Sequence, residues 1–494
     1  MKDLRKVLNC IVLLSMLCAT SFAQVVAPIP QEVYHDVPFD MRAIELPQFP
    51  DYKVSIVDFG AKSGSDFLNT EAINSAIRHV NERGGGVVAI PSGMWITGPI
   101  ELLSNVCLHT ESNAFILFSP DYSLYTRHDD NATTGRKKSQ SPIHAYNAEN
   151  IAITGEGVFD GNGNVWRMVK KDKMTENQWK QRIASGGVVV GDGKIWYPTK
   201  ELSQRDFRPN MIRLWECKRV LLQGVTFRNS PAWCVHPIHC EELTLHKISV
   251  INPWYAQNGD ALDIESCDRV LIYGCTIDAG DDAICIKSGK DEPGRRRGWP
   301  CRNVVARDNV VYHGHGGFVV GSEMSGGVKN IYIDNCTFIG TDVGIRFKST
   351  RGRGGVVENI YCHRINMFEI ANECILFDLY YAIKNADISQ AKPVDEGTPE
   401  FRNIHISDVY GVGGRRAMFF NGLPEMPIRD ITLRNISITD TKSGAVLRQS
   451  KNVVMENVSL TPHDGIPITL QNVSNALING TSISKVGNEI REMK

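Results

Sequence analysis

The sequence contains no CxxC pair and no zinc-ligand spacing among its 13 cysteines, so neither a metal nor another cofactor is expected. It has no excess of either charge, because 54 Lys and Arg residues nearly balance 55 Asp and Glu residues, and this disfavours nucleic acid as a partner. Beyond the N-terminus, no apolar run approaches the roughly 20 residues that a membrane span needs. The function is therefore sought in the chemistry of the side chains themselves.

The N-terminus has the order of a secretory signal peptide. Basic residues within the first six positions precede an apolar run over residues 7–19, and the segment ends in small residues up to Ala23. Residues 1–23 are therefore predicted to be a signal peptide, which implies a secreted or periplasmic protein. Residues 24–50 are expected to form an N-terminal extension, and residues 51–494 a single domain.

From about residue 150 onward the chain repeats the pattern N-V-x-L-x-x-V-x-F. Alternating apolar residues indicate strands, and a recurring long period indicates a solenoid. Because the repeats show no helical periodicity, an all-β parallel β-helix with one coil per repeat is predicted. Cys275, Cys336 and Cys362 occupy interior positions, and one or two disulfides are expected among the other cysteines. Repeats begin at Val220, Leu243, Val270, Val304, Ile331, Ile360, Ile431 and Val453.

Three segments depart from the repeat. A helix is predicted to begin with Thr70 as its cap and to end at glycines 84–86, where it would cover the open end of the solenoid. The segment 170–208 is interpreted as a loop inserted near the mouth of a cleft, and the basic run 295–297 as a solvated surface. The predicted helix carries three apolar residues on one face: Ile73, Ile77 and Val80.

Four short segments share one frame when they are aligned on their closing serines. In this frame Asp260 and Asp282 fall at one position, and Asp281 and His315 fall at the next. Because strands of adjacent coils lie about 4.8 Å apart, residues at one position are expected to be neighbours in space. Gly280 is expected to let Asp281 and Asp282 reach the same cleft. The segments are NGDALDIES (258–266), GDDAICIKS (280–288), HGGFVVGS (315–322) and TDVGIRFKS (341–349).

The residues in this frame predict a hydrolytic site. Three crowded carboxylates cannot all ionise cheaply, so one of them is expected to keep its proton near neutral pH. His315 can form a hydrogen bond with Asp281, and Arg346 and Lys348 offer cations to an anionic substrate. Such a site can protonate one oxygen, activate a water and bind an anion. Isolated acids in solenoid turns are usually structural, and this role is assigned to two of them: Asp263 and Asp342.

Further candidates lie beside the frame. Asn258 could cap a turn or contact substrate, and the turn is favoured. Tyr380 and Tyr381 could stack against a sugar, and one of the two is expected to do so. Trp254 and Tyr255 could also stack against a sugar or pack at the rim of the solenoid. Aromatic residues beside strands more often pack at the rim.

Four motifs stand in a fixed order: NGD (258–260), GDD (280–282), GHG (314–316) and RFK (346–348). In this order and spacing they resemble the signatures of glycoside hydrolase family 28, the polygalacturonases. The stretches 57–64 and 153–163 extend the resemblance over most of the chain. Gly259 and Phe347 depart from the usual Thr and Ile, but neither replaces a reacting group.

The resemblance implies a right-handed parallel β-helix of the pectin-lyase-like type and inverting hydrolysis of α-1,4-galacturonosidic bonds in pectin. It implies that Asp281 is the general acid, and that Asp260 and Asp282 hold and deprotonate the attacking water. The residues alone leave the stereochemistry open, because carboxylates one coil apart could have the roughly 5 Å separation of retaining enzymes or the about 6.5 to 9.5 Å of inverting ones.

Alternatives to this function remain. Exo action is preferred to endo action, because insertions around 165–210 and 380–400 could close one end of the cleft. A rhamnogalacturonan-type hydrolase of the same family would cut a related pectic chain. A β-helix pectate lyase would act by elimination, commonly with Ca²⁺. A non-catalytic carbohydrate-binding solenoid would need none of the reacting groups. In each case the expected partner is a polysaccharide.

Overall fold

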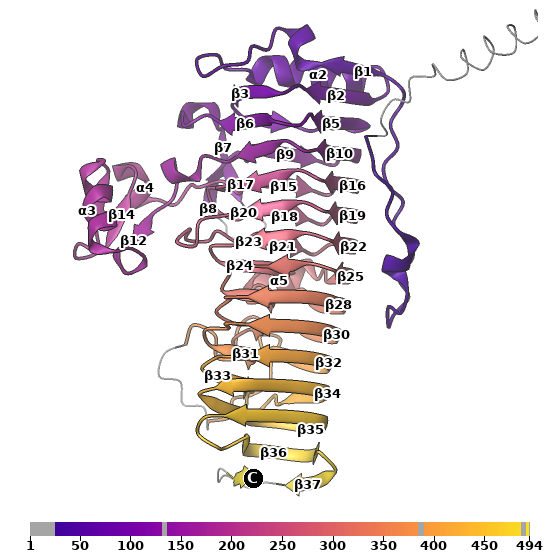
Figure 1. The fold of residues 1–494 in the computed structure, drawn as a ribbon, viewed down its shortest axis with the longest axis vertical. Coiled ribbons are helices and arrows are strands. Elements are labelled where there is room, and N and C mark those ends of the chain that lie inside the picture. Colours follow the sequence, from indigo (N-terminus) through magenta and orange to yellow (C-terminus); the bar gives the residue numbers. More distant parts are fainter. Residues whose placement is uncertain (1–24, 131–135, 384–389, 486–490, 494) are drawn as a thin grey trace, which may run out of the picture.

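The computed structural model describes residues 25–130, 136–383, 390–485 and 491–493, so the predicted signal peptide lies outside the described residues. The chain winds into a right-handed parallel β-helix, as predicted (Figure 1). A typical coil contains three strands, β21 (Leu262–Glu265), β22 (Asp268–Tyr273) and β23 (Thr276–Asp278). Each strand pairs in parallel with its equivalent one coil further on.

The strands stack into three faces along the solenoid. The first face contains β4 (Ile100–Glu101), β9 (Ile143–Tyr146), β15 (Ile212–Trp215), β18 (Val235–Ile238), β21, β24 (Asp282–Lys287), β27 (Gly316–Gly321), β29 (Ile345–Lys348), β31 (Glu373–Asp378) and β33 (Arg416–Asn421). The second contains β1 (Lys53–Ser55), β2 (Gly86–Ile90), β5 (Val106–Thr110), β10 (Glu149–Gly155), β16 (Lys218–Gln223), β19 (Glu241–His246), β22 and β25 (Cys301–Arg307). The third contains β3 (Gly93–Thr97), β6 (Ala114–Phe118), β11 (Val158–Asp160), β17 (Thr226–Arg228), β20 (Ser249–Ile251), β23 and β26 (Val310–Val311).

In the later coils the second and third strands merge into single long strands. These strands are β28 (Val328–Ile339), β30 (Val356–Phe368), β32 (Glu400–Val412) and β34 (Ile428–Thr441). The solenoid ends with β35 (Ser443–Pro462) and β36 (Ile468–Ile478). The short strands β37 (Thr481–Lys485) and β38 (Arg491–Met493) pair antiparallel to β36 and so cover the last edge.

The asparagine of the repeat has two structural roles. Asn303, Asn330, Asn359 and Asn403 all have left-handed backbones with φ between 49° and 57°, a conformation that Asn tolerates better than most residues. Their side-chain amides bond from coil to coil, with Nδ2 to Oδ1 distances of 3.0, 3.0 and 2.6 Å. This residue therefore bends the chain near the start of these strands and also joins neighbouring coils.

The cysteines are packing residues. All eleven that the structure describes are buried and free, so the expectation of disulfides among them is wrong. Cys275, Cys336 and Cys362 lie in the interior stack, as predicted. Burial raises the pKa of the Cys275 and Cys336 thiols to about 12, which keeps them protonated and unreactive.

Aromatic rings stack inside the coils that carry the later signature motifs. Phe347 and Phe377 lie parallel with ring centroids 4.4 Å apart, and Phe420 follows at 4.5 Å from Phe377. All three side chains are fully buried. Phe347, which replaces an aliphatic residue of the family pattern, therefore belongs to a continuous aromatic column behind the site.

Phe377→Ala should lower the free energy of unfolding by about 3–5 kcal/mol, because it removes the middle ring of this column and leaves a cavity that the neighbouring coils cannot fill. Urea unfolding measures the change. Phe368→Ala is the matched control, since Phe368 is 49 % exposed on β30. Equal effects of the two substitutions would show that the column does not stabilise the solenoid.

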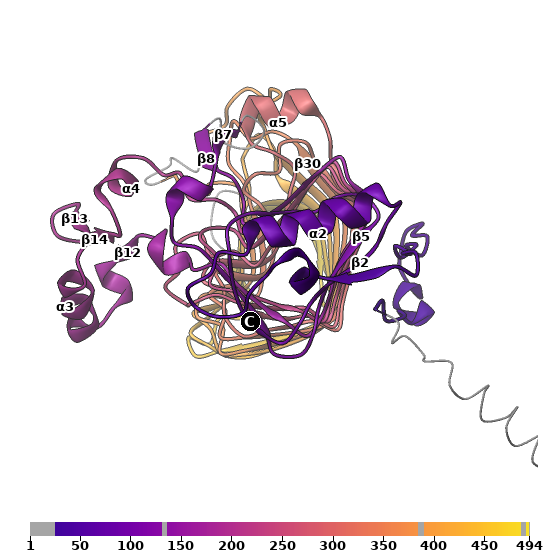
Figure 2. The same cartoon turned by 90° about the horizontal axis from the view of Figure 1, so that it is seen from above.

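Helix α2 (Thr70–Glu82) covers the N-terminal end of the solenoid (Figure 2). Ile73, Ile77 and Val80 are buried, as predicted. The N-cap is Asn69 rather than Thr70, because the Thr70 hydroxyl instead accepts a hydrogen bond from the Gly98 amide at 2.5 Å. Among the described helices, none is long and apolar enough to cross a membrane.

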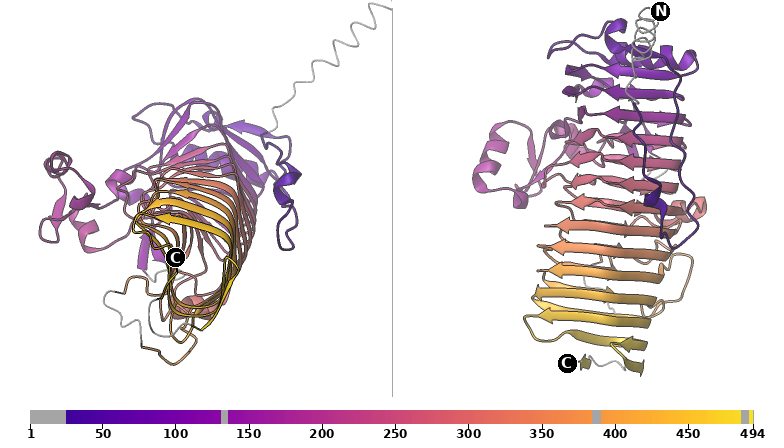
Figure 3. Two further views of the ribbon diagram at one scale, coloured as in Figure 1. Left: turned by 60° about the horizontal axis from the view of Figure 1, so that its bottom comes forward. Right: turned by 45° about the vertical axis from the view of Figure 1, so that its right-hand side comes forward.

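Residues 25–50 form an extended strap along the outside of the solenoid (Figure 3). Val33 and Ile44 are buried against three residues of the second face: Leu271, Val305 and Tyr332. Arg307 fastens the strap, because its guanidinium donates hydrogen bonds to the carbonyl oxygens of Glu32 and His35. The strap therefore covers apolar side chains that the second face would otherwise expose.

The segment 165–208 is a small folded unit rather than a loop, and we call it the insertion module. It leaves the solenoid between β11 and β15 and projects to one side (Figures 1 and 2). Its sheet has the antiparallel order β12-β14-β13, formed by β12 (Val169–Lys170), β14 (Ile195–Tyr197) and β13 (Val188–Val190). Two helices complete it, α3 (Glu176–Ala184) and α4 (Lys200–Gln204). Val169, Trp179 and Trp196 form its own buried core.

Candidate active site

Strand register confirms the frame that the serines define. Leu262 pairs with Ile284, so Asp260 and Asp282, each two residues earlier, hold the same place in adjacent coils. Asp282 pairs with Gly316, which aligns Asp281 with His315. Gly321 pairs with Lys348, so the basic residues of β29 continue the same register. The acids and the histidine lie at one corner of the solenoid, where a third strand ends and the next first strand begins.

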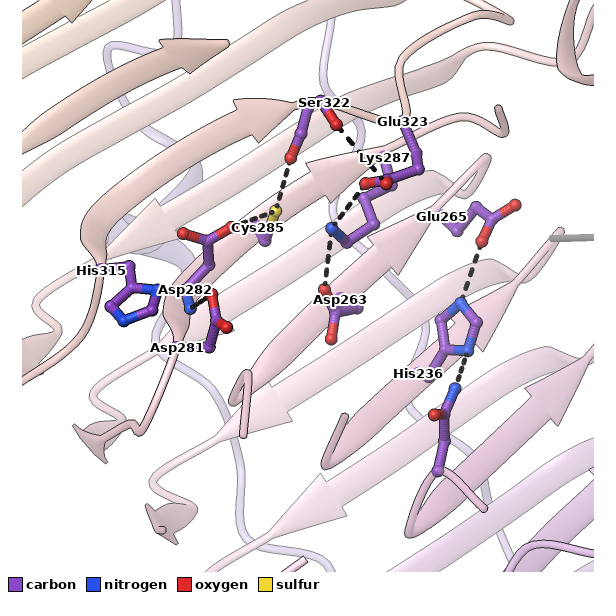
Figure 4. Close-up of polar contacts among 12 residues, drawn as sticks. His236, Asp263, Glu265, Asp281, Asp282, Cys285, Lys287, His315, Ser322 and Glu323 are labelled. Atoms are coloured by element: carbon purple, nitrogen blue, oxygen red, sulfur yellow. Dashed lines mark hydrogen bonds and ion pairs between the residues drawn. The ribbon is translucent and has the colours of Figure 1, made fainter. Parts of the chain in front are cut away.

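The three aspartates meet at this corner. One oxygen from each lies within 4.8 Å of the others. Asp260 and Asp282 are buried, whereas the side chain of Asp281 is 14 % exposed. Asp281 and Asp282 follow Gly280 at this corner (Figure 4). A Cβ at position 280 would lie 2.5 Å from the Pro253 carbonyl oxygen, so only glycine allows the close approach of this corner to the preceding coil. Asp281 is therefore the acid that is open to a ligand.

Two cations neutralise Asp282. Lys348 Nζ lies 2.5 Å from its Oδ2, and Arg346 Nη1 lies 3.3 Å from its Oδ1. Burial by itself would raise the pKa of Asp282, but Lys348, Arg346 and Lys287 hold it well below its usual range. The side chain of Lys348 is 6 % exposed and that of Arg346 is 17 % exposed. Of the two cations, Arg346 is thus the more accessible to a ligand.

His315 holds Asp281 from the next coil. Its Nδ1 lies 2.9 Å from Asp281 Oδ1 (Figure 4). Its Nε2 lies 3.8 Å from Asp342 Oδ2. The hydrogen bond to Asp281 raises the pKa of His315. The protonated form of His315 is therefore favoured, and it donates from Nδ1 to Asp281. Asp342 lies in a bend with its side chain 47 % exposed, in agreement with the turn role predicted for it.

Asp260 is the acid of the three whose pKa is raised. Burial raises its pKa well above the usual value, and the nearby Asp263 and Asp281 carboxylates add to this effect. Its Oδ1 is buried without a hydrogen-bond partner in the structure. Among the three acids, burial therefore favours the protonated form most at Asp260.

Asp260→Asn should stabilise the protein at neutral pH. An acid whose pKa is raised on folding favours the folded state most below its unfolded pKa, near 3.9, and loses this contribution as pH rises toward its folded pKa. Asparagine does not titrate, so the variant should match the wild type near pH 4 and exceed its stability at pH 7. Urea unfolding at both pH values measures this, with Asp192→Asn in an exposed turn as control. If the stability of Asp260→Asn relative to the wild type were lower at pH 7 than at pH 4, the raised pKa would be contradicted.

Of the remaining predicted residues, Asn258 and Tyr380 have structural contacts and Tyr381 lies beside the cations. Asn258 lies in a turn with φ of 57°, where its Oδ1 accepts a hydrogen bond from Arg208 at 3.0 Å. Tyr380 is buried in the main core. Tyr381 lies at the site instead, with its ring 5.1 Å from Lys348 Nζ and 5.8 Å from the Arg346 guanidinium carbon. Of the two tyrosines, the structure brings Tyr381 to the cations.

Ion pairs that were not predicted from the sequence lie beside the aspartates. Lys287 Nζ lies 3.4 Å from Asp263 Oδ1 and 3.2 Å from Glu323 Oε2 (Figure 4). Burial raises the pKa of Asp263 to about 7, against the opposing effect of Lys287. Asp263 thus lies inside strand β21 and not in a turn as expected. The signal was present, since Asp263 and Lys287 occupy alternate, same-face positions of the frame.

A second buried cluster continues along the first face. His236 Nε2 lies 3.0 Å from Glu265 Oε2, and Arg297 Nη2 lies 2.7 Å from Glu265 Oε1. Arg297 belongs to helix α5 (Asp291–Arg297), so the interpretation of the basic run as a solvated surface is wrong for this residue. The helix instead brings one cation down onto the strand face.

The same three aspartates are the group, within the part of the chain that the structure describes, whose ligand atoms lie close enough to hold a metal ion. Both oxygens of Asp282 already contact cations, and the pKa of Asp260 is raised. Metal ligation needs deprotonated and available oxygens. The donor set therefore fits a cation poorly.

Comparison with known proteins agrees with the fold and the motifs. Residues 170–460 match the family described as glycosyl hydrolases family 28. A probable polygalacturonase of Vitis vinifera is 29 % identical over 78 % of this chain and 74 % of its own length. An endo-polygalacturonase of Pectobacterium carotovorum is 24 % identical over 78 % of this chain and 87 % of its own. The crystal structure of an exopolygalacturonase from Thermotoga maritima superposes with a TM-score of 0.68 at 29 % identity, covering 91 % of this chain and 97 % of that one.

The β-helix, the carboxylate corner and the matched family together define a glycoside hydrolase. The chain belongs to glycosyl hydrolases family 28.

Proposed function

We propose that this protein hydrolyses α-1,4-galacturonosidic bonds in pectin. The observation that carries the proposal is the meeting of Asp260, Asp281 and Asp282 within 4.8 Å, with Arg346 beside them. Carboxylates supply acid and base for glycoside cleavage, and a guanidinium fork suits the carboxylate of a uronate sugar. The polygalacturonase names of the relatives at 29 % identity support the choice of galacturonate.

We assign the general acid to Asp281. It is the most exposed of the three acids, so its oxygen can reach a glycosidic oxygen. His315 lies 2.9 Å away and favours its protonated form, so it can return a proton to Asp281 after each turnover. Protonation of the leaving oxygen by Asp281 then breaks the bond to the anomeric carbon.

Asp282 and Asp260 together hold the attacking water. Lys348 and Arg346 keep Asp282 ionised, so it can accept a hydrogen bond from the water and take its proton. Burial raises the pKa of Asp260 and so favours its protonated form, which can donate to the water oxygen. We assign to the buried Lys348 an action through Asp282, and to Arg346 and Tyr381 the contact with the sugar, because the Arg346 side chain is 17 % exposed and lies 5.8 Å from the Tyr381 ring.

Inversion of the anomeric carbon is the outcome we propose. The oxygen separation within 4.8 Å is by itself nearer the roughly 5 Å typical of retaining enzymes than the longer distance of inverting ones. A retaining enzyme, however, needs an ionised carboxylate with a free oxygen as nucleophile. Both oxygens of Asp282 contact cations and Asp260 keeps its proton, so neither is suited to form a glycosyl ester. A water held between them is favoured.

Exo action is favoured over endo action by the insertion module, which leaves the solenoid between a third-face and a first-face strand, at the same corner as the aspartates. Incubation with polygalacturonate tests both activity and mode. Reducing ends should appear without an unsaturated, ultraviolet-absorbing product, and chromatography should show monomer or dimer first. Unsaturated products would indicate a lyase, activity restricted to rhamnogalacturonan would identify that substrate, and an early ladder of oligomers would indicate endo action.

We also propose that the protein acts outside the cytoplasm, because residues 1–23 have the order of a signal peptide and a pectic polymer is too large to enter a cell. In this proposal residues 24–50 are the strap of the mature protein and residues 51–494 its catalytic domain. N-terminal sequencing of the protein recovered from periplasm or medium tests it. A mature chain that still begins at Met1 would contradict it.

A further inference from the structure

The corner that carries the aspartates also carries a hollow formed by two segments. The insertion module leaves this corner between β11 and β15, and the turn 252–259 occupies it between β20 and β21, one coil before Asp282. Helix α3 of the module and the turn enclose a hollow of about 280 Å³. Gln178, Gln181 and Arg182 line it from the helix, and Trp254 and Tyr255 line it from the turn.

The two aromatic residues of the turn have different environments. Tyr255 packs against the module core that contains Trp179 and Trp196, so it fixes the turn to the module. Trp254 is 51 % exposed, and its ring stands at 88° to that of Tyr255 with centroids 5.9 Å apart. An indole that is held in place by its neighbour and left open beside a hollow offers a rigid apolar face to a ligand.

The polar groups around this indole include cations and amides. Lys173 Nζ lies 5.9 Å from the Trp254 ring, and Arg182 lines the hollow with its guanidinium carbon 5.0 Å from the Trp196 ring. The two glutamine amides can bond to hydroxyl groups. An apolar ring face, amides and cations together match a sugar that carries a carboxylate.

We propose that this hollow binds a uronate residue of the polysaccharide some distance from the bond that is cleaved. The inference rests on the proposed function and assigns the insertion module a role in holding the chain. From Trp254 to Asp260 the chain spans at most about 20 Å, so a short oligosaccharide can reach both places. The turn between them packs closely on Gly280, where a Cβ would lie 2.8 Å from Ala256 Cβ. Only substrates long enough to fill both places should benefit.

Two variants and a control test this subsite. Trp254→Ala removes the platform, Arg182→Gln removes the cation, and Lys180→Gln removes an exposed cation of the same helix that does not line the hollow. KM and kcat are measured on galacturonate oligomers from the disaccharide to the hexasaccharide. On the longest oligomers, Trp254→Ala should raise KM about tenfold, as expected for a lost stacking contact, with a smaller rise for the disaccharide. Arg182→Gln should show the same dependence on length, and Lys180→Gln none.

The outcomes separate this inference from the function on which it rests. If the wild type releases no reducing ends from any galacturonate oligomer, the proposed function fails and the inference with it. If the wild type is active and both variants equal Lys180→Gln at every length, the inference alone is overturned and the hollow is a packing feature. A loss that is equal at all lengths also overturns it, since a distal subsite cannot affect the disaccharide as strongly. Thermal unfolding of Trp254→Ala checks that the module stays folded. This substitution leaves the contact between Arg182 and Trp196 in place.

Discussion

Asp281→Asn is expected to lower kcat on polygalacturonate by about 10²- to 10⁴-fold, because asparagine keeps the shape of the side chain but has no proton to deliver to the leaving oxygen. Initial rates of reducing-end release measure the loss. The variant should keep its fold, since Asp281 lies at a corner and its side chain is partly exposed. It should also lower the pKa of His315, because the hydrogen bond to Asp281 is the largest cause of the raised value. NMR titration of the histidine measures that change.

A second aspartate–histidine pair provides the control. Asp440 Oδ1 lies 2.6 Å from His463 Nε2 in a late coil, on exposed side chains. Asp440→Asn changes the same pair of groups at the surface and should leave the rate unchanged. If Asp281→Asn kept more than a tenth of the wild-type rate, Asp281 would not be the general acid.

Lys348→Met is expected to lower the free energy of unfolding by about 3 kcal/mol and to abolish most activity, because it leaves the buried Asp282 without its closest cation. The two atoms concerned, Lys348 Nζ and Asp282 Oδ2, lie 2.5 Å apart with almost no exposure. Asp282 would then be held only by Arg346 at 3.3 Å and by the field of Lys287. Loss of the ionised form removes the base that takes the proton of the water.

The pH dependence of this effect has a defined sign. The pKa of Asp282 is lowered on folding, so its ionisation stabilises the protein above its unfolded pKa, near 3.9, and this contribution is lost as pH falls through the folded pKa. The destabilisation by Lys348→Met should therefore be largest at neutral pH and shrink in strong acid. Lys451→Met on an exposed position of β35 is the control. Equal stability loss at all pH values would show that the methionine disturbs packing only.

The frame of the site could be predicted from the sequence because the β-helix converts sequence offset into spatial register. Aligning the closing serines was enough to predict the register of Asp260, Asp282 and Lys348, since strands of adjacent coils pair residue by residue. Gly280 signalled the close approach, because any side chain there would meet the Pro253 carbonyl. The solenoid and its asparagine turns follow from the same local repeat.

Features that depend on contacts between distant segments could not be predicted in this way. The ordinary turn preference of aspartate pointed to a turn for Asp263, and although the frame puts Lys287 on the same face, the contact of Lys287 with Glu323 is visible only in the fold. The insertion module has no repeat to align, so its sheet and its contact with Tyr255 were not foreseen. The raised pKa of Asp260 depends on its burial, and burial is likewise visible only in the fold.

The most direct test of the proposed roles of Asp260, Asp281 and Asp282 is the configuration of the newly formed reducing end. Time-resolved proton NMR of trigalacturonate hydrolysis follows the two anomers before they equilibrate. Attack by a water held between Asp260 and Asp282 predicts that the β-anomer appears first from the α-linked substrate. Initial release of the α-anomer would show that one of these carboxylates forms a covalent intermediate, and the account of the site would be wrong.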